Sequence, residues 1–238
     1  MKRTAAMLSA VLATSLLAGC AASHKDDTTQ SQGKILGGIA DPVAQNDPEL
    51  SGPEPAIQAQ THFAAGQFAE AEGNFTVAAA QYEKACAAQK DYLWAEYRLA
   101  VVYSHMNDWS KSVAAWNNYI ESTNGAASAY SNLGFTWELA GDSSRAEEAY
   151  KKGIARDPKS QPCRVNYGLL LARNDRTAEA VEQFKTCLTP AEVHYNLASV
   201  YEQQGRQKMA RSEYQTALKL DPQMRDARER LAAINVNE

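Results

Sequence analysis

Cys20 is the residue whose surroundings most clearly predict a chemical modification. It follows a short apolar run, Ala5 to Leu16, and the small residues Ala18 and Gly19, and polar sequence begins directly after it. The run is too short to cross a membrane as a helix, which takes about 20 apolar residues. The same order of a basic start, an apolar run and small residues is typical of a cleaved secretory signal. Cys20 is therefore expected to be the first residue of the exported chain.

The four residues that end at this cysteine, Leu17-Ala18-Gly19-Cys20, resemble the lipobox of bacterial lipoproteins. The resemblance implies that a signal peptide of residues 1–19 is removed and that the Cys20 sulfur carries diacylglycerol. It also implies a further acyl chain, such as palmitate, on the new amino terminus. Two or three acyl chains anchor a protein stably, since each buried methylene contributes about 0.8 kcal/mol. Ala21, rather than Asp, follows the cysteine, which resembles the sorting signal for the outer membrane. The expected location is the outer membrane, lipid-anchored and facing the periplasm.

Residues 20–53 are predicted to be a tether. They are rich in Ser, Thr, Gln, Asp, Gly and Pro and show no sustained apolar period. A flexible chain of this length has a root-mean-square reach of about 30 Å. The small apolar island Lys34-Ile35-Leu36 with Ile39 is either a docking motif or ordinary loop sequence.

Composition and motifs exclude several classes of function. The net charge is −4 and no basic run occurs, which argues against binding nucleic acid. Four histidines (His24, His62, His105 and His194) are scattered, and no protease, hydrolase, phosphate-loop or metal-ligand motif appears. The sequence therefore predicts no enzymatic activity, no metal and no cofactor beyond the covalent lipid.

From about residue 55 the chain repeats itself with a period of about 34 residues. The repeats start at Ala59, Leu93, Ala127, Gln161 and Ala191. Each contains two apolar-periodic segments of about 14 residues, the length of a helix of roughly 20 Å. Residues that tolerate a left-handed backbone separate the two segments: Gly73, Asn107, Gly141, Asn174-Asp175 and Gly205.

Small residues at positions 8, 20 and 27, and aromatic residues at positions 11 and 24, match the tetratricopeptide repeat pattern. The third repeat shows it in Gly134, Trp137, Ala146, Tyr150 and Gly153. The resemblance implies an all-α chain, an α-solenoid of helix-turn-helix repeats wound into a right-handed superhelix. Five repeats would fill residues 54–222, and residues 223–238 would form a capping helix that shields the last repeat.

The fourth repeat, from Gln161 to Pro190, is about four residues short of the period. Its second helix is expected to lose its last turn. Thr189-Pro190-Ala191-Glu192 predicts a capping box with Pro at the first helical position of the next helix.

The resemblance also implies a concave groove lined by the first helix, helix A, of each repeat. The groove positions that suit peptide binding are Phe63, Trp94, Tyr97, Asn132, Phe135, Asn166 and Asn196. The three asparagines would bind a peptide backbone or serve only local hydrogen bonds. Trp94 would anchor a partner or pack against Tyr92.

Cys163 and Cys187 stand at positions 3 and 27 of the short repeat, at the same end of its predicted hairpin. An exported chain meets oxidising conditions, so the two cysteines either form a disulfide or remain free thiols. Cys86 is expected to remain a buried thiol.

These features predict a membrane-anchored scaffold or adaptor that binds a partner protein or peptide of the cell envelope in its groove. In build the chain resembles lipoproteins that assist assembly of type IV or Flp (Tad) pili and secretion complexes. The alternatives are an adaptor that recruits peptidoglycan hydrolases or proteases, and a structural homo-oligomer.

Overall fold

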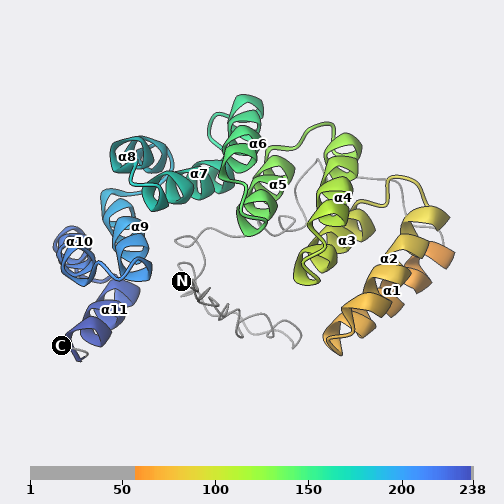
Figure 1. Ribbon diagram of the computed structural model, residues 1–238, viewed down its shortest axis with the longest axis horizontal. Helices are drawn as coiled ribbons and strands as arrows, with labels where there is room; N and C mark the ends of the chain where they lie inside the picture. The colour runs from red at the N-terminus through yellow and green to blue at the C-terminus, as the bar shows by residue number, and fades with distance from the viewer. Residues whose placement is uncertain (1–56, 237–238) are drawn as a thin grey trace, which may run out of the picture. The chain divides into compact units, whose positions relative to one another are not determined.

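The computed structural model describes residues 57–236, and the predicted signal peptide, Cys20 and tether lie outside the described residues. This part of the chain is all α-helical (Figure 1). Its helices are α1 (Ile57–Ala71), α2 (Phe75–Ala88), α3 (Leu93–His105), α4 (Trp109–Ser122), α5 (Ala127–Leu139), α6 (Ser143–Arg156), α7 (Gln161–Arg173), α8 (Thr177–Lys185), α9 (Pro190–Gln203), α10 (Gln207–Leu220) and α11 (Arg225–Val236). The fold class predicted from the sequence is confirmed.

Consecutive helices pair as antiparallel hairpins, and each hairpin packs on the next. The turn inside every hairpin contains one residue with a left-handed backbone at repeat position 15. These residues are Gly73, Asn107, Gly141, Asp175 and Gly205, with φ between 57° and 82°. Glycine, asparagine and aspartate adopt this conformation at the least steric cost. The predicted turn residues therefore end each helix A.

An N-cap side chain starts the second helix, helix B, in the first three repeats. Asn74 accepts a hydrogen bond from the backbone amide of Val77, and Asp108 and Asp142 stand in the same position of the next repeats. Each cap provides a partner for one of the backbone amides left unpaired at a helix start.

The contact between helices A and B is a small residue against an aromatic ring. The rings at position 24 are all fully buried: Tyr82, Trp116, Tyr150, Phe184 and Tyr214. They pack on glycine or alanine at position 8. At Gly66, Gly134 and Gly168 an added Cβ would lie 2.4 to 2.5 Å from a ring carbon. Burying each ring contributes about 1.5–3 kcal/mol, and the missing side chain is what lets the helices approach.

The fourth hairpin departs from this regularity as expected. Its helix B, α8, has 9 residues, whereas α2, α4, α6 and α10 have 14 each. The capping box that starts α9 is confirmed: Thr189 Oγ1 accepts from the Glu192 amide, and the Glu192 carboxylate accepts from the Thr189 amide at 2.8 Å. Pro190 is the first residue of that helix.

The last helix, α11, closes the C-terminal end of the repeats. Ala227 is fully buried and Ile234 is 5% exposed, and Leu231 packs against the same core. The exposed face of α11 carries charged residues, among them Arg225 and Glu229, which pair with each other at 2.7 Å.

Candidate peptide-binding surface

The helix A face of the first three repeats keeps several apolar side chains accessible. Trp94, in the first turn of α3, is 39% exposed, and Leu139 at the end of α5 is 40% exposed. Phe135 is half-buried and stands one turn before Leu139, so the two share one face of the helix. Phe63 of α1 is also half-buried, with its ring 5.3 Å from that of Tyr92.

Tyr97 does not line the surface as predicted. Its side chain is only 3% exposed and lies in the core of the second repeat. Its ring meets those of Trp116 and Tyr119 edge-on, with centroids 5.3 and 5.8 Å away. Tyr97 fills the space inside the hairpin, where the edge-on contacts with these two rings stabilise it.

The three position-6 asparagines are buried rather than presented to a ligand. Asn132, Asn166 and Asn196 are 1%, 3% and 0% exposed. The Asn166 amide donates to Ser131 Oγ at 3.1 Å, and the Asn196 amide donates to the Glu192 carbonyl at 2.8 Å. The first bond joins α7 to α5, and the second lies within α9. Both partners belong to the fold, so the geometry favours a structural role for the asparagines over peptide binding.

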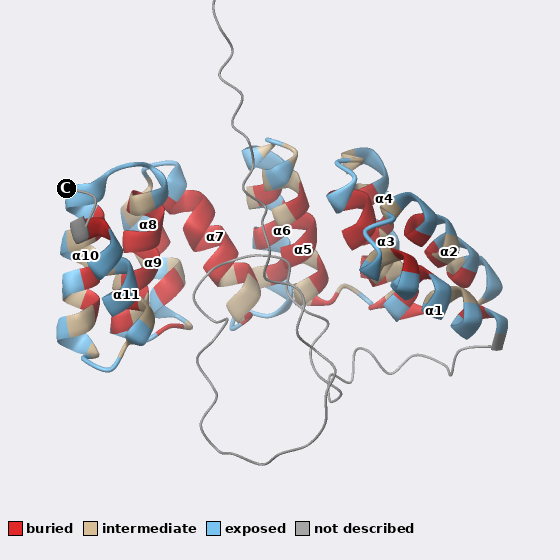
Figure 2. Ribbon diagram, turned by 90° about the horizontal axis from the view of Figure 1, so that it is seen from below, coloured by how far each residue is buried: buried red, intermediate tan, exposed pale blue. Residues whose placement is uncertain are grey.

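The packing of α7 explains this burial. α7 contacts its hairpin partner α8 and the preceding α6, and it also packs directly against α5 and α9, the helices A on either side. Every residue from Val165 to Ala172 is buried, and Figure 2 shows α7 almost wholly in red. The helix A face of the fourth repeat is therefore closed, and the accessible surface lies on α1, α3 and α5.

A polar chain recurs at the junctions of the first, third and fifth repeats. The position-24 tyrosines Tyr82, Tyr150 and Tyr214 donate to the position-12 glutamates Glu70, Glu138 and Glu202, at 2.8, 2.5 and 2.7 Å. Each glutamate also pairs with an arginine of the odd-numbered helix that follows: Arg98, Arg173 and Arg230. Each carboxylate thus links the two helices of one repeat to the next element of the array. The sequence shows a Glu twelve residues before each of these tyrosines, but the bond between them and the link to the next repeat are evident only in the structure.

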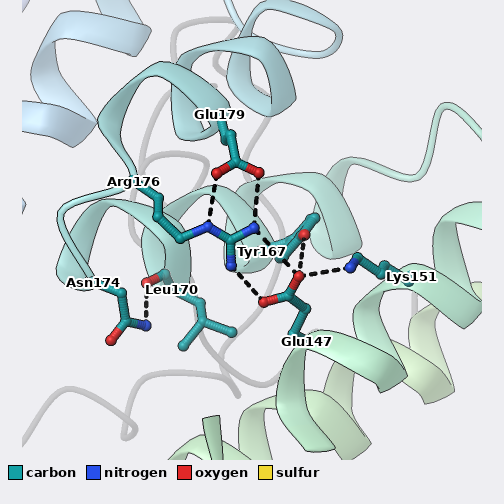
Figure 3. A network of polar contacts seen from close by, with 7 residues as sticks. All are labelled: Glu147, Lys151, Tyr167, Leu170, Asn174, Arg176 and Glu179. Atoms are coloured by element: carbon teal, nitrogen blue, oxygen red, sulfur yellow. Dashed lines mark hydrogen bonds and ion pairs between the residues drawn. The ribbon is translucent and has the colours of Figure 1, made fainter. Parts of the chain in front are cut away.

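The α6–α7 junction carries a second polar network, drawn in Figure 3. Glu147 of α6 accepts from Tyr167 Oη of α7 at 2.8 Å and from Arg176 at 2.7 Å, and it pairs with Lys151 at 2.6 Å. Arg176 also binds Glu179 at 2.7 Å. The hydrogen bond from Arg176, followed by that from Lys151, lowers the pKa of Glu147 from 4.5 to about 2. The carboxylate therefore stays ionised and fixes the third repeat to the fourth.

Comparison with known proteins agrees with this architecture. Family models described as "Tetratricopeptide repeat" match residues 140–192 and 191–224. The described chain has the tetratricopeptide-repeat fold.

Solved structures with this fold are similar to the chain at low sequence identity. A thermophilic tetratricopeptide repeat protein of Thermus thermophilus is 21% identical, with a TM-score of 0.52 over 75% of this chain and 99% of that one. MamA from residue 41 to its end, of Desulfovibrio magneticus, is 13% identical, with a TM-score of 0.55 over 72% of this chain and 99% of that one. A tetratricopeptide repeat protein of Parabacteroides merdae is 13% identical, with a TM-score of 0.52 over 74% of this chain and 70% of that one. No curated protein sequence matches the chain. Proteins with this fold are typically non-enzymatic scaffolds.

The two cysteines of the short tetratricopeptide repeat are not joined, and the disulfide considered from the sequence is absent. Cys163 is fully buried, and its Sγ donates to the Ala127 carbonyl of the preceding repeat at 3.1 Å. α8 ends at Lys185, so Cys187 lies beyond the helix on which position 27 was expected. Burial raises the pKa of Cys163 to about 11 and that of Cys86 to about 12, which keeps both thiols protonated.

A cleft of 530 Å³ lies between α2, α3 and α4, and its lining residues are different from the predicted groove residues. Asp91, Glu96 and Glu121 line it with Lys90, so its charge is predominantly negative. Within residues 57–236 no cluster of side chains suits a metal ion. Over the same residues, no helix is long and apolar enough to cross a bilayer.

Proposed function

We propose that the repeats form a scaffold that binds an extended segment or a helix of a partner protein on the helix A face of α1, α3 and α5. The observation that carries this proposal is the exposure of Trp94 at the start of α3. Tryptophan is among the residues that most often anchor protein interfaces. Phe63, Phe135 and Leu139 add apolar surface on the neighbouring helices A.

The binding surface excludes the fourth repeat, because its helix A is closed by direct packing against α5 and α9. Asn166 therefore links α7 to α5, and Asn196 bonds within α9, so both side chains serve the fold rather than the ligand. A partner would contact apolar side chains first. Arg98 and Glu70, which pair with each other, add charge on the same helices, α3 and α1.

The location proposed for this scaffold comes from the N-terminal sequence. The lipobox at Leu17 to Cys20 supports covalent lipid on Cys20, and Ala21 supports the outer membrane. A body of repeats on a tether of residues 20–53 would hold its partner near the bilayer. A role in the assembly of a pilus or a secretion complex rests on the likeness of this build to lipoproteins of such systems.

The partner surface is tested by chemical cross-linking in intact cells followed by identification of the attached protein. Trp94→Ala is expected to reduce capture at least tenfold, since a hot-spot residue contributes about 2 kcal/mol or more. Its matched control is Met209→Ala, which removes a side chain that is 46% exposed on helix B of the last repeat. Both variants should keep the helical circular dichroism of the wild type. Equal capture by the two variants would refute the proposed surface.

The biological role and the anchor have separate tests. Pili and secretion complexes of this kind cross the outer membrane through a pore protein, the secretin. A deletion strain in which that pore fails to reach the outer membrane supports the role in pilus or secretion assembly. Unchanged pili with altered cell-wall turnover would instead indicate an adaptor of peptidoglycan hydrolases. Intact-mass analysis of membrane-extracted protein should show acyl chains on Cys20, and an unmodified thiol there would rule out the anchor.

A further inference from the structure

Helix A of each repeat presents positions 3, 7 and 10 to the repeat before it. α7 shows these contacts directly. Cys163 at position 3 bonds the Ala127 carbonyl, and its Sγ occupies the space that a Cβ on Gly153 of α6 would need. Tyr167 at position 7 bonds Glu147 of α6. Position 10 makes the same kind of contact in α5, where Thr136 accepts a hydrogen bond from Trp116 of α4 at 2.9 Å. The three positions together form the junction face of a repeat.

The junction face of the first repeat is exposed, whereas positions 3 and 10 of every later repeat are buried. Phe68 stands at position 10 of α1 and is 71% exposed, the largest exposed fraction among the large apolar side chains of the described residues. The residues at position 10 of the later repeats are 0 to 4% exposed: Val102, Thr136, Leu170 and Val200. Thr61 and Ala65, at positions 3 and 7 of α1, are exposed as well.

The two ends of the repeat array thus differ. At the C-terminal end α11 covers the last hairpin and buries Ala227 and Ile234. At the N-terminal end nothing among residues 57–236 covers α1 in the same way. A solenoid needs a cover at both ends, because each repeat buries only part of its apolar surface by itself.

We propose that residues 34–39 of the same chain, Lys34-Ile35-Leu36-Gly37-Gly38-Ile39, cover the junction face of α1. This segment is the densest apolar run between Cys20 and α1, and it brings three large aliphatic side chains. Its lysine complements Glu72, which is exposed at the end of α1 beyond Phe68. Apolar side chains seated on Phe68 and Ala65 would replace the missing preceding repeat.

The connection to α1 has the length that this contact requires. Residues 40–56 join the segment to α1, and a flexible chain of that length has a root-mean-square reach of about 23 Å. Phe68 lies eleven residues along the helix from Ile57, a distance of about 17 Å. A tethered segment of this kind meets its site at an effective concentration of about 1 mM or more, so a weak contact is sufficient.

The size of the junction face disfavours a second copy of the chain as the cover. A stable dimer buries about 800 Å² on each partner. The junction face of α1 is one face of a helix of 15 residues, with Phe68 as its one large apolar side chain. The segment on the same chain needs no such area, because its linkage to α1 supplies the proximity.

The test is hydrogen exchange of α1, followed by mass spectrometry on the full-length protein. Leu36→Asp should make the amides around Phe68 exchange about tenfold faster than in the wild type. Without the segment on its junction face, α1 opens locally more often, and its amides exchange during these openings. Val43→Asp adds the same charge to the same part of the sequence outside the segment, and it should leave exchange unchanged. Wild-type protection should be the same at dilute and concentrated protein.

A second variant tests the α1 side of the same contact. Phe68→Ala should also speed exchange of α1, and adding Leu36→Asp to it should have no further effect. Wild-type rates in both Leu36→Asp and Phe68→Ala would overturn the proposal. So would protection of α1 that grows with protein concentration, which would identify a second copy as the cover.

Discussion

Tyr150 donates a hydrogen bond of 2.5 Å to the Glu138 carboxylate, and that carboxylate also pairs with Arg173 of the next repeat. Burial and the adjacent Glu138 raise the pKa of Tyr150, so its hydroxyl remains a donor at neutral pH. Glu138 is only 11% exposed, which makes the loss of either partner costly. One carboxylate therefore connects three helices, α5, α6 and α7.

Tyr150→Phe should lower the free energy of unfolding by about 2 kcal/mol, because it removes a hydrogen bond to a buried charge. Phe184 occupies the same position of the fourth repeat, so the ring itself is tolerated there. Urea denaturation measures the change. Tyr130→Phe, on α5 but outside this pair, is the control and should cost less than about 0.5 kcal/mol. Equal losses in the two variants would contradict the role given to the Tyr150–Glu138 bond.

Gly134→Ala should destabilise the third repeat by about 1–3 kcal/mol through overpacking. The added Cβ would stand 2.5 Å from a ring carbon of Tyr150, which is fully buried and has little room to move. The control is Gly141→Asn in the following turn, where φ is 82° and no atom lies within 4 Å of the added Cβ. Asn107 already adopts this conformation in the second repeat. Thermal unfolding should show a larger loss for Gly134→Ala, and the reverse order would be inconsistent with the packing described.

Acid should weaken the junction at Glu147. Its pKa is lowered from 4.5 to about 2, chiefly by the hydrogen bond from Arg176. The folded state then binds fewer protons than the unfolded state between these two values, so the contribution of Glu147 to stability is present above pH 4.5 and is lost as the pH falls towards 2.

The melting temperature, followed from about pH 7 to about pH 2, should therefore fall less steeply in Glu147→Gln than in the wild type. Glu182→Gln, which changes a glutamate whose side chain is 72% exposed, should keep the wild-type slope. The same slope in Glu147→Gln and the wild type would show that this network does not respond to pH.

Thiol labelling should distinguish the three described cysteines. Cys163 and Cys86 should react slowly with maleimide at about pH 7.5, because burial holds both thiols protonated. Cys86 and Cys187 are both half-buried, and burial raises the pKa of Cys187 as well. Cys187 lies in a turn beyond α8, so it should react before the two thiols that stand on helices. Rapid labelling of all three after addition of denaturant is the positive control. A Cys163–Cys187 disulfide in the exported protein, found by peptide mapping, would overturn this assignment.

The hairpins, their turns and their cores were predictable from the sequence, because each depends on residues within one repeat. Gly134 against Tyr150 and the left-handed turn at Gly141 follow from the spacing of small and aromatic residues. The capping box at Thr189 and Glu192 is equally local. Such features need no knowledge of how one repeat lies on the next.

The accessibility of the groove positions was not predictable in the same way. Whether Asn166 is exposed depends on how closely α5, α7 and α9 approach one another, and the pattern within one repeat does not fix that distance. Tyr97 was misplaced for a related reason, because its burial depends on contacts with Trp116 and Tyr119 of the facing helix. Trp94 is accessible because it stands in the first turn of its helix. Neither the approach of neighbouring helices A nor the aromatic contacts inside the hairpin bury it.

Site-specific photo-cross-linking in intact cells tests the central claim most directly. A photo-reactive residue is placed at position 94, in place of Trp94, and in a parallel strain at position 209, in place of Met209. The helix A surface predicts that the probe at 94 forms an adduct with another envelope protein and that the probe at 209 does not. Adducts from position 209 alone, or adducts at 94 only with a second copy of the chain, would contradict it.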